Sequence, residues 1–93
     1  MKTITISIGN SDNKLTQKEW SEFVERVNKL ILMNATRVHF FGGAANWMPW
    51  QNVAWIFDCE DRKIHAFKEA LTFLRMAYQQ DSACYLESVT ELI

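Results

Sequence analysis

The chain has few of the residues that staple or interrupt a small domain. Its 93 residues include two cysteines, three glycines and one proline. Cys59 and Cys84 form no CxxC pair, so the sequence spells out neither a zinc site nor a redox motif. We therefore expect both cysteines to be reduced thiols in the core, with a contact between them across strands left open, and we expect no metal and no cofactor.

The chain also lacks an excess of charge and a long apolar run. Ten Lys and Arg stand against 11 Asp and Glu, whereas a general nucleic-acid binder carries a basic excess that neutralises phosphates. No apolar run approaches the roughly 20 residues that cross a bilayer, and the first residues lack the apolar segment of a signal peptide. Nucleic acid is therefore disfavoured as a non-specific partner, a membrane is not expected, and we predict a cytoplasmic location.

What the sequence does contain is enough apolar material for one core. Hydrophobic residues make up 48% of the chain, a share that lets one domain spanning residues 1–93 fold without a disulfide or metal. Residues 3–8 alternate polar and apolar, which predicts a half-buried strand with Ile4, Ile6 and Ile8 toward the core.

The clearest boundary is the start of a helix at residue 16. Thr16 and Glu19 match the capping box, in which each side chain accepts a hydrogen bond from the other residue's amide. Leu15 and Trp20 match the hydrophobic staple that accompanies such a start. Apolar residues then recur every three or four positions, which predicts a helix ending near Asn34.

The remaining elements complete a recognisable order. We expect strands at residues 36–41, 52–58 and 82–88, and a second helix capped by Asp58 or Asp61. The order βαββαβ predicts an α+β fold, the ferredoxin-like sandwich, with two helices on one face of a four-stranded antiparallel sheet in the order 4-1-3-2.

One face of that sheet has no helix to cover it, and its side chains are those out of phase with the core. The fourth strand's phase stays open between Cys84 with Leu86 and Ala83 with Tyr85. Self-association through this face, or through an edge strand, is one consequence that we weigh. The predicted open-face residues on the first three strands are Thr3, Thr5, Ser7, Arg37, His39, Phe41, Ala54 and Ile56.

Residues 42–51 form a long connection between two strands, beyond the two to five residues usual for a hairpin. Trp47, Met48 and Trp50 lie in it. Three interpretations stay open. The side chains fold back over the open end of the core, they line a ligand pocket, or they project as anchors for a partner, because aromatic residues dominate interface hot spots. With His39 and Phe41, they are the predicted partner-binding residues.

Catalysis has little support in the sequence. His39 and His65 are the only histidines, and no spacing indicates a nucleophile beside a base. The acidic cluster of Asp58, Glu60 and Asp61 is more typical of a helix start than of a metal site. No catalytic residue is predicted, although a small enzyme or ligand-binding domain of the dimeric ferredoxin-like type, with a pocket lined by His39, Trp55 or Tyr85, stays as an alternative.

Residues 4–20, 49–55 and 78–83 resemble a group of short proteins encoded by bacteriophages and prophages. That resemblance implies a protein that binds a host protein and inhibits it by steric blocking, as counter-defence proteins such as anti-CRISPR inhibitors do, in the cytoplasm of the host cell. It supplies no catalytic residue. A component of the virion or an assembly factor is a further alternative.

Overall fold

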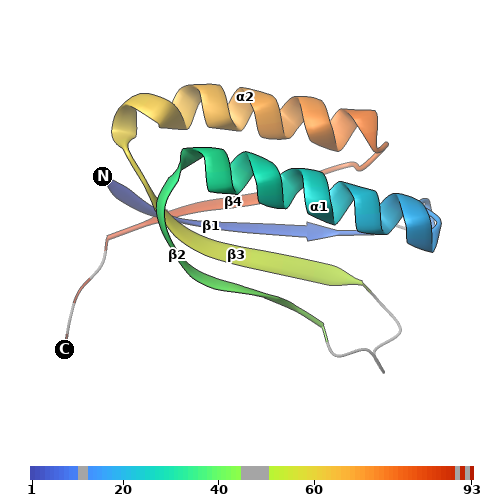
Figure 1. Cartoon of the computed structure of the whole chain (residues 1–93), viewed down its shortest axis with the longest axis horizontal. Helices are drawn as coiled ribbons and strands as arrows, with labels where there is room; N and C mark the ends of the chain where they lie inside the picture. The colour runs from blue at the N-terminus through green and yellow to red at the C-terminus, as the bar shows by residue number, and fades with distance from the viewer. Residues whose placement is uncertain (11–12, 45–50, 90, 92) are drawn as a thin grey trace.

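The computed structural model describes residues 1–10, 13–44, 51–89, 91 and 93. Its elements follow the predicted order, and Figure 1 shows both helices on the same side of the sheet. The ferredoxin-like βαββαβ sandwich is thus confirmed. The elements are β1 (Lys2–Gly9), α1 (Gln17–Asn34), β2 (Ala35–Gly43), β3 (Asn52–Cys59), α2 (Asp61–Ala77) and β4 (Cys84–Ser88).

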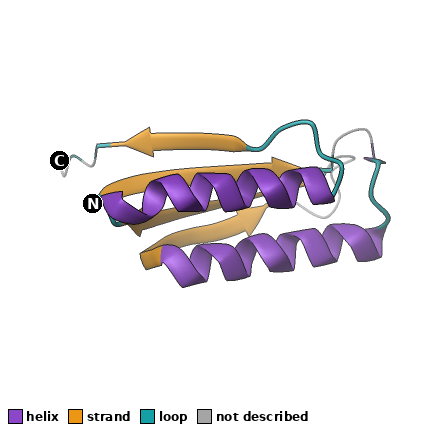
Figure 2. Cartoon of the chain, turned by 90° about the horizontal axis from the view of Figure 1, so that it is seen from above, coloured by secondary structure: helices purple, strands orange, loops and turns teal. Residues whose placement is uncertain are grey.

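The sheet has the predicted strand order, β2-β3-β1-β4, and the pairs β1–β3, β1–β4 and β2–β3 are all antiparallel. Ile4 lies opposite Phe57, and Ile6 lies opposite Trp55. Because side chains alternate along a strand, these residues all point to the side that the helices cover. Seen from above, α1 and α2 lie across that side (Figure 2).

The core lies between this face and the two helices. On the sheet side, Ile4, Ile6 and Ile8 are buried in the core, as predicted. Full burial of one such side chain contributes roughly 1.5–3 kcal/mol to the free energy of unfolding. The buried side chains of the two helices therefore contribute much of the stability. The buried residues of the helices are Trp20, Phe23, Val27, Ile31, Ile64, Phe67 and Leu71.

The capping box of α1 is confirmed. The Glu19 amide donates to Thr16 Oγ1 at 3.2 Å, and the Thr16 amide donates to Glu19 Oε1 at 3.0 Å. Leu15 and Trp20, the predicted staple, are both buried. The hydrogen bonds from Thr16 lower the pKa of the Glu19 carboxyl.

The start of α2 differs from the prediction. The residue at the N-cap position is Glu60, and it makes no side-chain cap hydrogen bond because its carboxylate accepts from Arg62 Nε at 2.7 Å. Asp61 is already the first helical residue, and Asp58 lies in β3. The prediction that Asp58 or Asp61 caps this helix is therefore wrong.

The end of α2 is a Schellman turn. The Gln80 amide donates to the Arg75 carbonyl and the Gln79 amide to the Met76 carbonyl, both at 3.0 Å. Gln79 has φ 58, the left-handed conformation that this turn requires and that usually selects glycine. The turn leads directly toward β4.

Candidate binding surfaces

The open face is the side of the sheet away from both helices. The strand register arranges its side chains in three rows that cross all four strands. The apolar row consists of Leu86, Thr5, Ile56 and Phe40. The polar row consists of Ser88, Thr3, Asp58 and Arg37. The small row consists of Cys84, Ser7, Ala54 and Gly42. The register also settles the phase of the fourth strand, because Leu86 lies opposite Thr5 on this face and Tyr85 opposite Ile6 on the other.

The apolar row leaves large side chains in contact with solvent. Phe40 is 48% exposed and Leu86 is 56% exposed, at the two ends of the row. Between them, Ile56 is half-buried. The Phe40 ring lies over Gly42, where a Cβ atom would come within 2.8 Å of the ring. An apolar stripe across an uncovered sheet face is a feature of association surfaces.

The polar row is built around Asp58. Asp58 Oδ1 accepts from Thr3 Oγ1 at 2.9 Å, and Asp58 Oδ2 lies 2.9 Å from His39 Nε2. The hydrogen bond from Thr3, with the smaller contribution of His39, holds the pKa of Asp58 below its ordinary value. His39 therefore lies on the open face, as predicted, with its ring oriented by a carboxylate.

Phe41 lies elsewhere than predicted. The pairing of β2 with β3 shifts register between Ala35 and Arg37 and again between Val38 and Phe40, as β-bulges do. The second shift reverses the alternation, so Phe41 lies opposite Trp55 and stacks on its indole, with the ring centroids 5.3 Å apart. Phe41 is thus on the helix side, and Phe40, which strict alternation missed, takes its place on the open face.

The two cysteines are far from each other. Cys59 is buried at the end of β3, and burial raises the pKa of its thiol. Cys84 is exposed in the small row of the open face. The expectation that both are core thiols is therefore wrong for Cys84, and a contact between them is excluded because they point to opposite faces.

Trp47, Met48 and Trp50 lie outside the described residues. The flanks of their segment are held by several contacts. The Ala44 amide donates to the Asn52 carbonyl at 3.0 Å, and Asn10 Nδ2 donates to Gln51 Oε1 at 2.8 Å. The role of the three loop residues stays a prediction.

Of the three side chains offered as the lining of a pocket, His39, Trp55 or Tyr85, only Tyr85 lines one, between α2 and β4. Trp55 is fully buried, and its Nε1 donates to Asn28 Oδ1 at 3.0 Å. Tyr85 shares the helix side with Trp55, whereas His39 lies on the open face. These three side chains therefore do not line a common site.

Neither a metal cluster nor a membrane span is found in the part of the chain that the structure describes. There, no group of three or more His, Cys, Asp or Glu side chains is placed to hold a metal ion. Of the described helices, neither is long and apolar enough to cross a membrane.

Comparison with known proteins shows similarity in fold alone. No protein-family model and no curated protein sequence matches the chain. Among solved structures, it is similar to a dimeric ferredoxin-like protein of unknown function from Thermobifida fusca YX, with a TM-score of 0.58 and 14% identity over 97% of this chain and 92% of that one. It is also similar to LarC2, the C-terminal domain of a cyclometallase involved in the synthesis of the NPN cofactor of lactate racemase. That match has a TM-score of 0.50 and 16% identity over 95% of this chain and 55% of that one.

Together with the strand order, these matches define the class of protein as a ferredoxin-like domain. At 14% and 16% identity, the similarity supports the fold and assigns no activity to the chain.

Proposed function

We propose that the chain is a protein-binding domain without catalytic activity, and that it assembles as a homodimer through its open face. The observation that carries the proposal is the apolar row, which exposes Phe40 and Leu86 on a surface that the chain's own helices leave uncovered. Burying such side chains against a second copy removes apolar area from water.

The arrangement of the open face suits a two-fold interface. In such an interface the same patch of both subunits is used, so it has to complement itself. The apolar row crosses the middle of the face, with polar and small rows on its two sides. A two-fold axis through the row places apolar side chains against apolar ones and leaves the polar row at the rim, as in known interfaces. The dimeric state of the Thermobifida fusca protein supports this assembly.

More specifically, we propose that the partner is a host protein and that binding inhibits it. This proposal rests on the resemblance to short phage and prophage proteins, which also implies steric blocking as the mechanism and the host cytoplasm as the location. Trp47, Met48 and Trp50 are then contacts to the partner, and the homodimer presents two copies of them.

Sedimentation velocity over a range of protein concentrations tests the dimer. We expect the wild-type chain to sediment as a dimer at micromolar concentration, and Phe40→Lys or Leu86→Lys to shift it to monomer because each buries a charge in the interface. Phe73→Lys is the matched control, since Phe73 is a 77% exposed aromatic on α2. A wild-type monomer at every concentration, or dissociation by the control alone, would contradict the proposal.

A further inference from the structure

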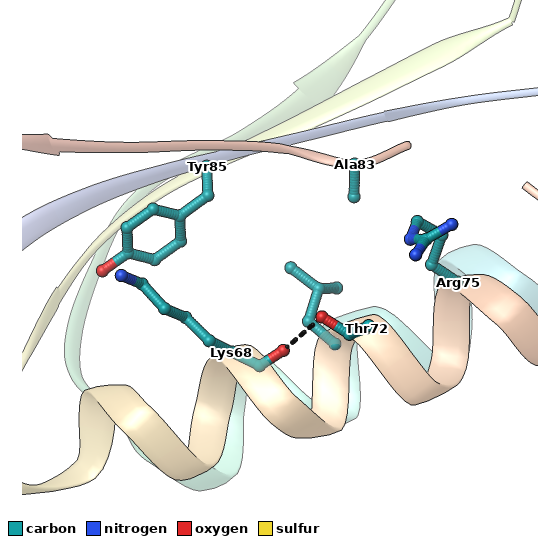
Figure 3. A pocket seen from close by; sticks show the side chains of 6 residues that line it. Lys68, Thr72, Arg75, Ala83 and Tyr85 are labelled. Atoms are coloured by element: carbon teal, nitrogen blue, oxygen red, sulfur yellow. Dashed lines mark hydrogen bonds between the residues drawn. The ribbon is translucent and has the colours of Figure 1, made fainter. Parts of the chain in front are cut away.

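A groove runs between α2 and β4, on the helix side of the sheet. It has a volume of about 200 Å³ and is partly open to solvent. Figure 3 shows Tyr85 descending from β4 toward Lys68 at one end, and Ala83 and Arg75 at the other. Leu71, which is 5% exposed, also lines it. The groove thus has a mixed lining, with one cationic side chain near each end.

Along this groove, β4 is an edge strand. It pairs with β1 from Cys84 to Ser88 in an unbroken register, and no described strand pairs with its other side. The backbone N–H and C=O groups on the outer side of an edge strand are available to a further strand. The opposite edge, β2, is less suited, because its two register shifts interrupt the ladder.

The two cations are held in place, Lys68 by a ring and a long ion pair and Arg75 by backbone carbonyls. Lys68 Nζ lies 4.3 Å from the centre of the Tyr85 ring and forms an ion pair with Glu87 Oε1 at 3.8 Å, a distance longer than a hydrogen bond. The Arg75 Nη1 group donates to the carbonyls of Gln80 and Asp81 at 2.8 and 3.1 Å. Carbonyl oxygens fix the guanidinium but do not cancel its charge, and its Nε and Nη2 donors have no partner among the described residues.

From this geometry we infer that the groove binds an extended acidic peptide segment of a partner protein, which adds a strand to the free edge of β4. The inference rests on the proposed role as a binding protein and supplies the chemistry of its partner. Main-chain hydrogen bonds give such strand addition its affinity, and side-chain pockets give it specificity. A second copy of the chain is a poorer occupant, because pairing two β4 strands would bring the Lys68 and Arg75 side chains of both copies to one seam.

The spacing of the two cationic side chains along the groove predicts a sequence pattern for the peptide. Lys68 and Arg75 are seven positions apart on α2, about 10 Å along the helix axis. Positions i and i+4 of a strand point to the same side and lie about 13 Å apart, a difference that the long Lys side chain accommodates. Position i+2 then faces Leu71 and Ala83. The favoured pattern is therefore acidic, any, apolar, any, acidic.

Fluorescence anisotropy of a labelled peptide, Glu-Thr-Val-Thr-Glu with blocked ends, tests the inference. We expect Lys68→Glu to weaken binding at least tenfold and Lys68→Arg to preserve it. Lys18→Glu is the matched control, because it makes the same charge change at an exposed position of α1. Ala83→Leu, which fills the groove without changing charge, should also abolish binding.

Two altered peptides separate strand addition from simple charge attraction. A peptide with Lys in place of both Glu residues should not bind, and a peptide N-methylated at alternate backbone amides should lose most of its affinity. Three outcomes would overturn the inference. The wild-type protein does not bind the peptide, Lys68→Glu and Lys18→Glu weaken binding equally, or the N-methylated peptide binds with full affinity. The Phe40→Lys variant should still bind the peptide, so failure of the groove and failure of the open-face dimer give different results.

Discussion

The carboxylate of Asp58 joins three strands of the open face through its contacts with Thr3 and His39. Asp58 belongs to an acidic cluster at the end of a strand, and such clusters usually cap the next helix. In the fold, however, it is still within β3, where the pleat turns its side chain to the open face. Thr3 and His39, which contact it there, come from two other strands. These contacts depend on register across three strands, which local sequence does not encode.

The Thr3–Asp58 hydrogen bond leads to a prediction at this scale. Thr3→Val removes the Oγ1 donor, and we expect the free energy of unfolding at pH 7 to fall by roughly 1 kcal/mol. The native pKa of Asp58 is lowered, whereas the unfolded chain titrates near the ordinary value of about 3.9. The stabilisation by the ionised carboxylate is therefore complete above that value and is lost as the pH falls through the native pKa.

Urea unfolding of both proteins between pH 3 and pH 7, at one protein concentration, measures this effect. The deficit of Thr3→Val should shrink toward the acid end of the range. A deficit that is the same at every pH would show that Thr3 acts through packing and not through the ionised Asp58.

At the scale of the elements, local patterns predicted what is local. The capping box at Thr16 and the alternation in β1 depend on neighbours within a few residues, and both are present in the structure. The prediction from alternation is wrong for β2, because a β-bulge depends on the pairing with the partner strand. Phe40 and Phe41 are adjacent aromatics, so sequence alone could not show which of them faces the helices.

The Schellman turn after α2 leads to a prediction at this scale. A residue with a Cβ atom in the left-handed conformation costs roughly 1–2 kcal/mol, and Gln79 has φ 58. Gln79→Gly should therefore raise the free energy of unfolding by about 0.5–1 kcal/mol, after the larger flexibility of glycine in the unfolded chain is taken into account.

Thermal and urea unfolding of Gln79→Gly and of Gln79→Ala measure the gain. Alanine keeps the Cβ atom, so it should give no stabilisation. A loss of stability with glycine would mean that the Gln79 side chain contributes more than its backbone strain costs.

At the scale of the whole molecule, the central feature is that both helices lie on one side of the sheet (Figure 1). The order of elements predicted this layering and therefore an open face. The side chains on that face could be predicted for β1 and β3, in which polar and apolar positions alternate regularly. They could not be predicted in full for β2 and β4. For the groove beside β4, the sequence offered only Tyr85 as a lining residue; Lys68 and Arg75 were not predicted, because they come from another element.

The reactivity of Cys84 toward iodoacetamide tests the open-face dimer most directly. Cys84 is exposed in a single copy and lies in the small row, whereas Cys59 is buried with a raised pKa and should react slowly in either state. If two copies cover each other's open face, wild-type Cys84 should react several-fold more slowly than Cys84 in the Phe40→Lys variant at high protein concentration. Equal rates in the two proteins at every concentration would contradict the account.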